Sequence, residues 1–138
     1  MTQIRFFVQG QPRGKGRPRH MKNGHVYTDQ KTRDYENLIW IACKSAMKGV
    51  QPFEHATQVT IRAVMKVPAS ASKRAKTAML CGMAKPESKP DLDNIIKAVL
   101  DGCNGVAFRD DKQVVSIRAS KEYGETPGVE VIIEEEAQ

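Results

Sequence analysis

The chain has 138 residues, of which 40% are hydrophobic and 28% charged, the composition of an ordinary globular domain. It contains no apolar run close to the ~20 residues that a membrane-spanning helix needs, and no signal-peptide core follows the first methionine. Its three cysteines are widely spaced and form neither a disulfide framework nor a Cys-x-x-Cys zinc pattern. We therefore expect one domain, residues 1–138, in the reducing cytoplasm.

The net charge of +6 is unevenly distributed along the chain. Residues 1–28 contain six Lys and Arg and no acid, and residues 55–86 repeat that pattern. Acidic residues gather instead in residues 87–111 and in the tail, Glu130–Glu136. A basic body around an acidic centre suits a polyanion held close to bound cations, so the charge pattern favours a nucleic-acid partner over simple solubility.

The first predicted elements are a strand and a basic loop. Residues 4–8 alternate between the two faces of a strand. Residues 11–24 are rich in Gly, Pro and base, but they lack the spacing of a phosphate-binding P-loop. The glycines permit close backbone approach, and the basic side chains are candidate partners for DNA phosphates, whereas the alternative is a freely solvated, flexible loop. The predicted phosphate partners are Arg13, Lys15, Arg17 and Arg19.

The middle of the chain predicts a helix, a strand and a second basic segment. Residues 25–27 form a possible short strand, Thr28 is the expected N-cap, and a helix over residues 29–48 ends at Gly49. Residues 59–67 alternate as a strand. Residues 69–82 predict either a mobile helical flap that binds DNA or an exposed helix without a role. The basic residues assigned to DNA here, with one from the connector that follows, are Lys73, Arg74, Lys76 and Lys89.

The most informative stretch is Lys89–Lys97, which predicts the start of an amphipathic helix. Pro90 disfavours helical backbone at the residue before it, so the helix begins afterwards with Asp91 as its N-cap. Apolar residues then recur at helical spacing, which predicts one buried stripe: Leu92, Ile95, Ile96, Val99 and Leu100.

The polar face of the same helix carries Asp93, Lys97 and Asp101 at spacings of four residues. Asp91 and Asp93 both lie at the positive end of the helix, where negative charge is favoured. The simplest alternative is a capped surface helix with an ion pair between Asp93 and Lys97.

The last third of the chain predicts strands and no histidine chemistry. Residues 106–108 form a possible short strand, residues 109–112 a turn, and residues 113–121 and 129–135 two strands that we expect to pair as an antiparallel hairpin. The three histidines are isolated from any nucleophile motif, and we predict that none is catalytic: His20, His25 and His55.

Four aspartates form the chemical constellation: Asp91, Asp93, Asp110 and Asp111. Carboxylates that are brought together repel one another unless a cation intervenes. All-oxygen ligands without His or Cys favour hard ions, so we expect Mg²⁺, with Mn²⁺ possible. Such ions activate water and stabilise a phosphodiester under attack, and Lys97 is placed to contact the same phosphate. The alternative for the Asp110-Asp111 pair is an ordinary turn.

Two motifs resemble the RusA family of Holliday junction resolvases, which are common in phages and prophages: Lys89-Pro-Asp-Leu-Asp-Asn-Ile-Ile-Lys-Ala-Val-Leu-Asp-Gly-Cys-Asn-Gly-Val and Arg109-Asp-Asp-Lys-Gln-Val-Val. The resemblance is dense over residues 88–133 and faint before them, and the basic loop after the first strand is also similar to that family. The aromatic residues that precede the first aspartate in some members are absent, because Ser88-Lys89-Pro90 stands there.

The resemblance implies a compact α+β (α/β) fold with a mixed sheet and helices on one side of it. It also implies a homodimer that cuts the two strands of a four-way DNA junction in recombination and repair. The catalytic residues carry over to Asp91, Asp93, Asp111 and Lys97, with Asp110 as a further metal ligand or as the third ligand in place of Asp111. The alternative function is a phage-derived protein that binds branched DNA without cutting it, and a nucleotide-handling phosphotransferase ranks lower because no P-loop is present.

Overall fold

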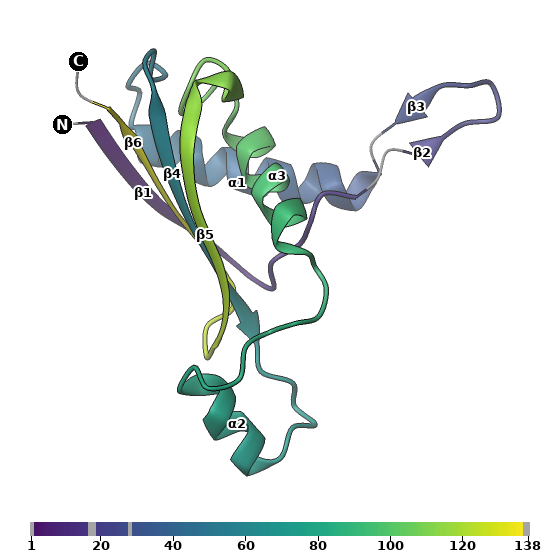
Figure 1. The fold of residues 1–138 in the computed structure, drawn as a ribbon. Helices are drawn as coiled ribbons and strands as arrows, with labels where there is room; N and C mark the ends of the chain where they lie inside the picture. Colours follow the sequence, from purple (N-terminus) through teal and green to yellow (C-terminus); the bar gives the residue numbers. More distant parts are fainter. Residues whose placement is uncertain (1, 17–18, 28, 137–138) are drawn as a thin grey trace.

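The computed structural model describes residues 2–16, 19–27 and 29–136. A four-stranded sheet forms the centre of the molecule, with the strand order β1-β6-β4-β5 (Figure 1). The strands are β1 (Thr2–Gln9), β4 (Thr57–Lys66), β5 (Val114–Gly124) and β6 (Gly128–Glu135). Strand β6 pairs antiparallel with β1 and β4, whereas β4 and β5 are parallel, so the predicted mixed sheet is confirmed.

The predicted hairpin between the last two strands is wrong, because β4 lies between β5 and β6. Strand β4 buries Val59, Ile61 and Met65 on one face and Val64 on the other, so it gains most from a central position. Strand β5 leaves Val115 exposed and occupies an edge of the sheet. Residues 125–127 connect β5 to β6, which continues on the other side of β4.

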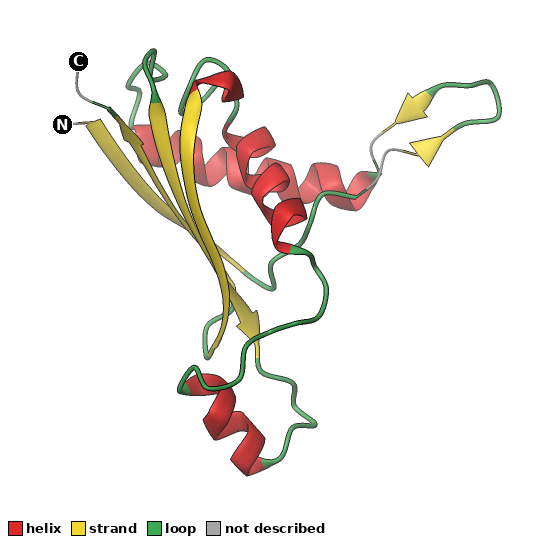
Figure 2. Ribbon diagram, in the orientation of Figure 1, coloured by secondary structure: helices red, strands yellow, loops and turns green. Residues whose placement is uncertain are grey.

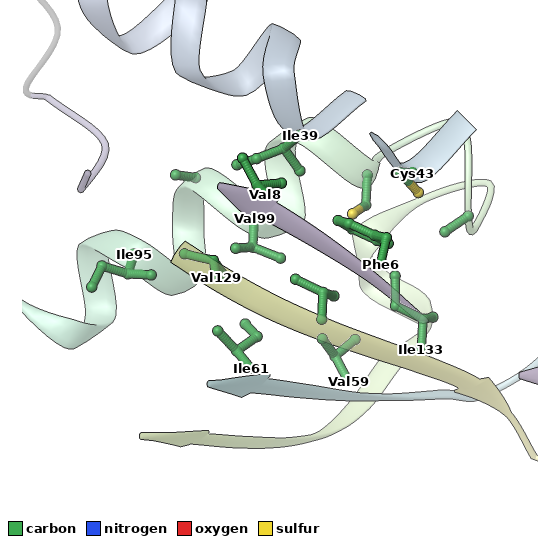
Figure 3. Close-up of a cluster of buried hydrophobic side chains, with 14 of the residues drawn as sticks. Phe6, Val8, Ile39, Cys43, Val59, Ile61, Ile95, Val99, Val129 and Ile133 are labelled. Atoms are coloured by element: carbon green, nitrogen blue, oxygen red, sulfur yellow. The ribbon is translucent and has the colours of Figure 1, made fainter. Parts of the chain in front are cut away.

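Two helices, α1 (Gln30–Met47) and α3 (Leu92–Cys103), pack against each other on one face of this sheet (Figure 2). Figure 3 shows the core between the sheet and these helices, where side chains such as Phe6, Ile39 and Val99 meet. A third helix, α2 (Lys73–Leu80), contacts β5, buries none of its residues and confirms the helical prediction for this segment. None of the helices in the described ranges is long and apolar enough to cross a membrane.

The ends of α1 and α3 follow local capping chemistry. The Asp29 side chain caps α1 by accepting a hydrogen bond from the Thr32 N–H, and the predicted cap Thr28 lies outside the described residues. Helix α1 ends at the left-handed Lys48, and Gly49 follows with a φ of 78°. Asp91 is the N-cap of α3, as predicted, with extended backbone and no side-chain capping bond.

A small two-stranded sheet projects from the body beside the start of α1 (Figure 1). It consists of β2 (Arg19–His20) and β3 (Val26–Tyr27), which pair antiparallel. The strand expected near residues 25–27 is confirmed, whereas the prediction of an unbroken loop over residues 11–24 is wrong at β2. Short strands of two residues carry little periodicity, so the sequence gives no signal for β2.

Candidate metal and nucleic-acid site

The basic loop after β1 is docked against both helices. Pro12 is buried, and the Lys15 N–H donates a 2.9 Å hydrogen bond to the carbonyl oxygen of Asn94 in the first turn of α3. The Gly16 N–H donates a 3.0 Å hydrogen bond to Oγ1 of Thr32 near the start of α1. The alternative of a freely solvated loop is therefore wrong for residues 12–16.

Gly14 allows this docking because it lacks a side chain. A Cβ atom at this position would lie 2.8 Å from Cβ of Asn94 and 3.2 Å from Cβ of Pro90, both closer than ordinary contacts. The loop backbone can therefore touch the beginning of α3 only if this residue is glycine.

The ammonium group of Lys15 joins the two helices by ion pairs. Its Nζ lies 3.3 Å from Oε2 of Glu36 on α1 and also contacts Oδ2 of Asp101 near the end of α3. The hydrogen bond to Asp101 is the main reason that the pKa of Lys15 is raised, with Glu36 contributing further. Lys15 was predicted to bind a DNA phosphate, and within one chain its charge is held by these two carboxylates.

A groove of about 460 Å³ runs between the docked loop, the start of α1 and the segment that leads into α3. Three basic residues line it, namely Arg13, Lys31 and Lys89, together with one acid, Asp29, which caps α1. Pro90 also lines the groove, and Asp91 follows directly in the chain. The predicted cations Arg13 and Lys89 therefore lie beside the predicted acids, and the groove adds Lys31, which the sequence analysis missed.

The two aspartates of the helix motif lie at the N-terminal end of α3, where both are exposed. The unpaired N–H groups of the first helical turn favour negative charge at this end. Lys97 follows one turn after Asp93, is exposed, and has no ion pair among the described residues. The predicted contact of Lys97 with a DNA phosphate stays a prediction.

The second acidic pair lies in the short 3₁₀ turn η1 (Asp111–Gln113) after α3. Asp110 caps this turn by accepting a 3.0 Å hydrogen bond from the Lys112 N–H. This bond is the main cause of its lowered pKa, whereas the hydrogen bond between the two carboxyl groups raises the pKa of Asp111. The pair therefore both forms a turn, as the simpler alternative predicted, and concentrates acidic oxygens at an exposed position.

Within one chain, the structure separates the predicted acids into two groups. The carboxylates that raise the pKa of Asp111 are those of Asp110 and Asp101, and Asp101 lies near the C-terminal end of α3. Asp93 precedes Asp101 by eight residues, which places their backbones about 12 Å apart along the helix. Asp91 and Asp93 are thus at the opposite end of α3 from Asp101.

No group of three or more His, Cys, Asp or Glu side chains among the described residues is arranged to hold a metal ion. Mg²⁺ usually binds through one or two protein carboxylates, retains several waters and completes its shell with substrate phosphate oxygens. The donor chemistry of Asp91 and Asp93 fits that kind of site. The participation of Asp110 and Asp111 stays a prediction.

The other predicted DNA contacts lie at separate places. Lys73 and Arg74 are exposed on α2, and Lys76 is half-buried there. Figure 1 shows α2 at one end of the molecule and the β2–β3 sheet at another, with the start of α3 between them. Arg17 lies outside the described residues, and the side chain of Arg19 also lies outside them.

Sequence reasoning gave no role to the two acids that hold Lys15, which are Glu36 and Asp101. Asp101 shares the polar face of α3 with Asp93 and Lys97, so its spacing was a usable signal. Glu36 has no comparable signal, because its role depends on Lys15, which is 21 residues away in the chain.

Comparison with known proteins gives two findings. A family model described as endodeoxyribonuclease RusA matches residues 9–134, which span the loop, the three helices and the sheet except most of β1 and the last residue of β6. The Bacillus subtilis (strain 168) protein YqaN, described as uncharacterized, is 34% identical over 139 residues, and the match covers 98% of each protein.

Proposed function

Because the chain belongs to the RusA endodeoxyribonuclease family, we propose that it is a Mg²⁺-dependent, structure-selective nuclease that resolves Holliday junctions by paired phosphodiester cleavage. Membership of the family supports a DNA nuclease in general terms. The metal, the junction specificity and the roles of single residues are the parts that we propose.

The proposal rests mainly on one observation, which is that the groove with three basic lining residues lies next to the two carboxylates at the start of α3. Arg13, Lys31 and Lys89 line the groove, and Asp91 and Asp93 follow at the start of α3. Cations that hold the DNA backbone thus lie next to acids that suit a hard metal ion.

In this proposal Asp91 and Asp93 hold the ion, which supplies an activated water and stabilises charge on the phosphate when it is bound. Lys97 contacts the same phosphate and offsets the charge that develops during cleavage. Asp111, supported by Asp110, serves as a further ligand. Since Asp111 lies with Asp101 in one chain, we propose that the ligand comes from the partner in a homodimer or joins when DNA binds.

The proposed partner is a four-way DNA junction, bound by a homodimer so that the two opposed strands are both within reach of a site. The proposed place of the reaction is the cytoplasm, in DNA recombination and repair. The basic residues of α2, Lys73, Arg74 and Lys76, would contact the DNA backbone away from the cut.

The decisive experiment compares a synthetic four-way junction with a linear duplex of the same sequence, each labelled on every strand in turn, with Mg²⁺ and with EDTA. We expect symmetric nicks in two opposed strands of the junction, only with Mg²⁺, and little cutting of the duplex. Binding of the junction without any nicking, in Mg²⁺ or Mn²⁺, would instead support the alternative of a non-catalytic protein that binds branched DNA.

A further inference from the structure

The segment between α2 and α3, residues 81–90, leads directly into the helix that carries the predicted acids, and we call it the connector. Figure 1 shows it leaving α2, passing β5 and entering the start of α3. Between residues 85 and 90, no backbone group hydrogen bonds to another backbone group in the described part of the chain. The path of the connector, and with it the position of Asp91, therefore depends on a few side-chain contacts.

Lys121 supplies one of these contacts from the edge strand β5. Its Nζ donates a 2.6 Å hydrogen bond to the carbonyl oxygen of Ser88 in the connector. Lys121 pairs across the sheet with Ala63, which is fully buried in the core, so its side chain leaves β5 on the face that the helices cover. The lysine is half-buried and has no ion pair within the described ranges. Its ammonium is thus available to hold the connector.

Two other contacts hold the connector on either side of this hydrogen bond. Pro86 is buried, and Pro90 lies against the basic loop, where a Cβ atom on Gly14 would lie 3.2 Å from Cβ of Pro90. Pro90 also lines the groove beside that loop. The hydrogen bond from Lys121 is the contact that a single substitution can remove without altering either the connector or the loop.

The chain between this hydrogen bond and the first acid is short and stiff. Asp91 follows Ser88 by three residues, which is at most about 10 Å of extended chain. Pro90 fixes its own φ and restricts the backbone of Lys89 before it. A displacement of the Ser88 carbonyl is therefore passed on to Asp91 instead of being absorbed between them.

We propose that Lys121 is a positioning residue, whose ammonium holds the Ser88 carbonyl and thereby fixes Asp91 at the start of α3. It acts through the connector and does not contact the substrate. The effect on the reaction can be large, because a displacement of about 1 Å in a reacting group can lower a rate about 100-fold. This inference rests on the proposed function for the reaction that is measured, but the position of Asp91 can also be followed without cleavage.

The rival explanation is that Lys121 binds a DNA phosphate. Loss of a phosphate contact weakens binding and lowers the log–log slope of affinity against salt by about 0.9 for duplex DNA. Loss of a positioning contact leaves that slope unchanged and lowers the rate of cutting even when all of the protein is bound to DNA. The two roles of Lys121 therefore predict different measurements.

Three variants make the comparison. Lys121→Met removes the donor and keeps a long side chain, whereas Lys121→Arg keeps a cationic N–H donor. Arg118→Met is the matched control for net charge, because Arg118 is exposed on the other face of β5 and has no ion pair in the part of the chain that the structure describes.

Cutting of a four-way junction is measured in Mg²⁺ under single-turnover conditions at saturating protein. We expect the rate to fall about tenfold or more in Lys121→Met, to recover in Lys121→Arg and to stay normal in Arg118→Met. The salt slope of junction binding, measured in EDTA, should be the same for Lys121→Met as for the unaltered protein.

Hydrogen exchange of the free protein supplies a measurement that needs no cleavage. The N–H groups of Asn94 and Ile95 both donate 3.1 Å hydrogen bonds to the carbonyl oxygen of Asp91, so their exchange reports how firmly Asp91 is held. We expect faster exchange at these two amides in Lys121→Met and not in the other two variants. Exchange in the central strand β4 should be unchanged in all three, which checks that the fold is intact.

Each outcome supports or overturns the positioning role. Normal cutting by Lys121→Met, a salt slope reduced by about 0.9, or unchanged exchange at Asn94 and Ile95 overturns it. Slower cutting with faster exchange and an unchanged slope supports it. If the unaltered protein cuts no junction, the proposed nuclease activity fails, and the exchange measurement alone still decides whether Lys121 fixes Asp91.

Discussion

The backbone N–H of Lys15 donates a 2.9 Å hydrogen bond to the carbonyl oxygen of Asn94, and so ties the basic loop to the helix that carries the predicted catalytic residues. The side chain of the same lysine binds Asp101 and Glu36. The position of the loop and that of α3 are therefore not independent. Changing these contacts one at a time therefore distinguishes residues that bind DNA from residues that hold the loop against α3.

The first prediction concerns the charge of Lys15. Lys15→Met should reduce stability by about 1 kcal/mol, because Glu36 and Asp101 lose their shared cation at a position that is only partly exposed. The raised pKa of Lys15 means that its contribution is complete below the unfolded-state value near 10.5 and is lost as pH rises through the higher folded-state pKa. Urea unfolding measures the difference in unfolding free energy between Lys15→Met and the unaltered protein. The ionisation of Lys15 should leave this difference constant up to pH 9, and the difference should shrink at more alkaline pH.

Salt dependence distinguishes this role from phosphate binding. Each phosphate contact contributes about 0.9 to the log–log slope of affinity against salt for duplex DNA. Arg13→Met should reduce that slope, whereas Lys15→Met should change it much less, since Lys15 is already paired. An equal reduction in the two variants would show that Lys15 leaves its carboxylates to bind DNA. Lys22→Met, on the exposed turn of the β2–β3 sheet, controls for loss of net charge.

The second prediction concerns the close contact at Gly14. Gly14→Ala should displace the loop from the start of α3, because the new Cβ would lie 2.8 Å from Cβ of Asn94. We expect cleavage to fall by more than tenfold while thermal stability falls only slightly, since Pro12 is the one buried side chain among loop residues 12–16 and none of these residues belongs to the hydrophobic core cluster. Lys15→Arg, which keeps the charge and the backbone hydrogen bond, is the control and should retain most of the activity. A Gly14→Ala enzyme that cuts at the normal rate would show that the docked position of the loop is not required.

The positions of the helices and the identity of the α3 motif could be predicted because both depend on local patterns. The Asp91 cap and the apolar spacing that includes Ile95 and Val99 are contained within one stretch of chain. The place of β4 between β5 and β6 could not be predicted, since β5 and β6 have similar alternation and a short connection favours a hairpin. What distinguishes β4 in the structure is the burial of Val64 on its second face in addition to Val59, Ile61 and Met65 on the first, and burial is a property of the whole fold.

In the candidate site, too, residues close in sequence could be predicted and contacts between distant segments could not. Asp91, Asp93 and Lys97 are close in sequence, so helical spacing was enough to place them together. The contact of Lys15 with Glu36 and Asp101 joins three distant segments, and no local pattern specifies it. For the same reason the sequence could not show that Asp111 lies with Asp101 rather than with Asp93.

The third prediction separates the two groups of acids. Asp93→Asn should keep junction binding and abolish cleavage, because the amide retains the shape of the side chain but not the charge that holds a cation. Asp101→Asn should lower stability through the loss of its partner Lys15 and should reduce cleavage less. Binding is measured by mobility shift in Ca²⁺ or EDTA, and cutting is measured in Mg²⁺. Normal cutting by Asp93→Asn would remove this residue from the site.

The participation of Asp111 has its own test, because the single chain does not bring it to Asp93. If a homodimer completes the site, a mixture of Asp93→Asn and Asp111→Asn proteins should form heterodimers that regain one intact site, and single nicks should appear. If each chain builds its own site, such heterodimers contain one defect in each site and remain inactive. Each variant alone is the control, and both should be inactive in either case.

The fourth prediction concerns the attachment of α3 to the core. Ile95 is fully buried one turn after the acidic N-terminus of the helix, so Ile95→Ala should lower the free energy of unfolding by about 2–5 kcal/mol. Val115→Ala, at a side chain that is 60% exposed on the edge strand, should change it by less than about 0.5 kcal/mol. Urea unfolding monitored by circular dichroism measures the unfolding free energy of both variants. If the slope of this free energy against urea concentration equals that of the unaltered protein, only stability has changed.

Because Ile95 is two residues from Asp93, the same variant also tests how rigidly the site must be held. The unfolding free energy of a domain this size is typically about 5–15 kcal/mol, so Ile95→Ala should remain mostly folded at low temperature. We expect its cleavage rate there to fall more than the folded fraction does, since the cavity left by the side chain lets the first turn of α3 shift. A cleavage rate that simply follows the folded fraction would mean that the packing beneath α3 supports the fold without positioning the acids.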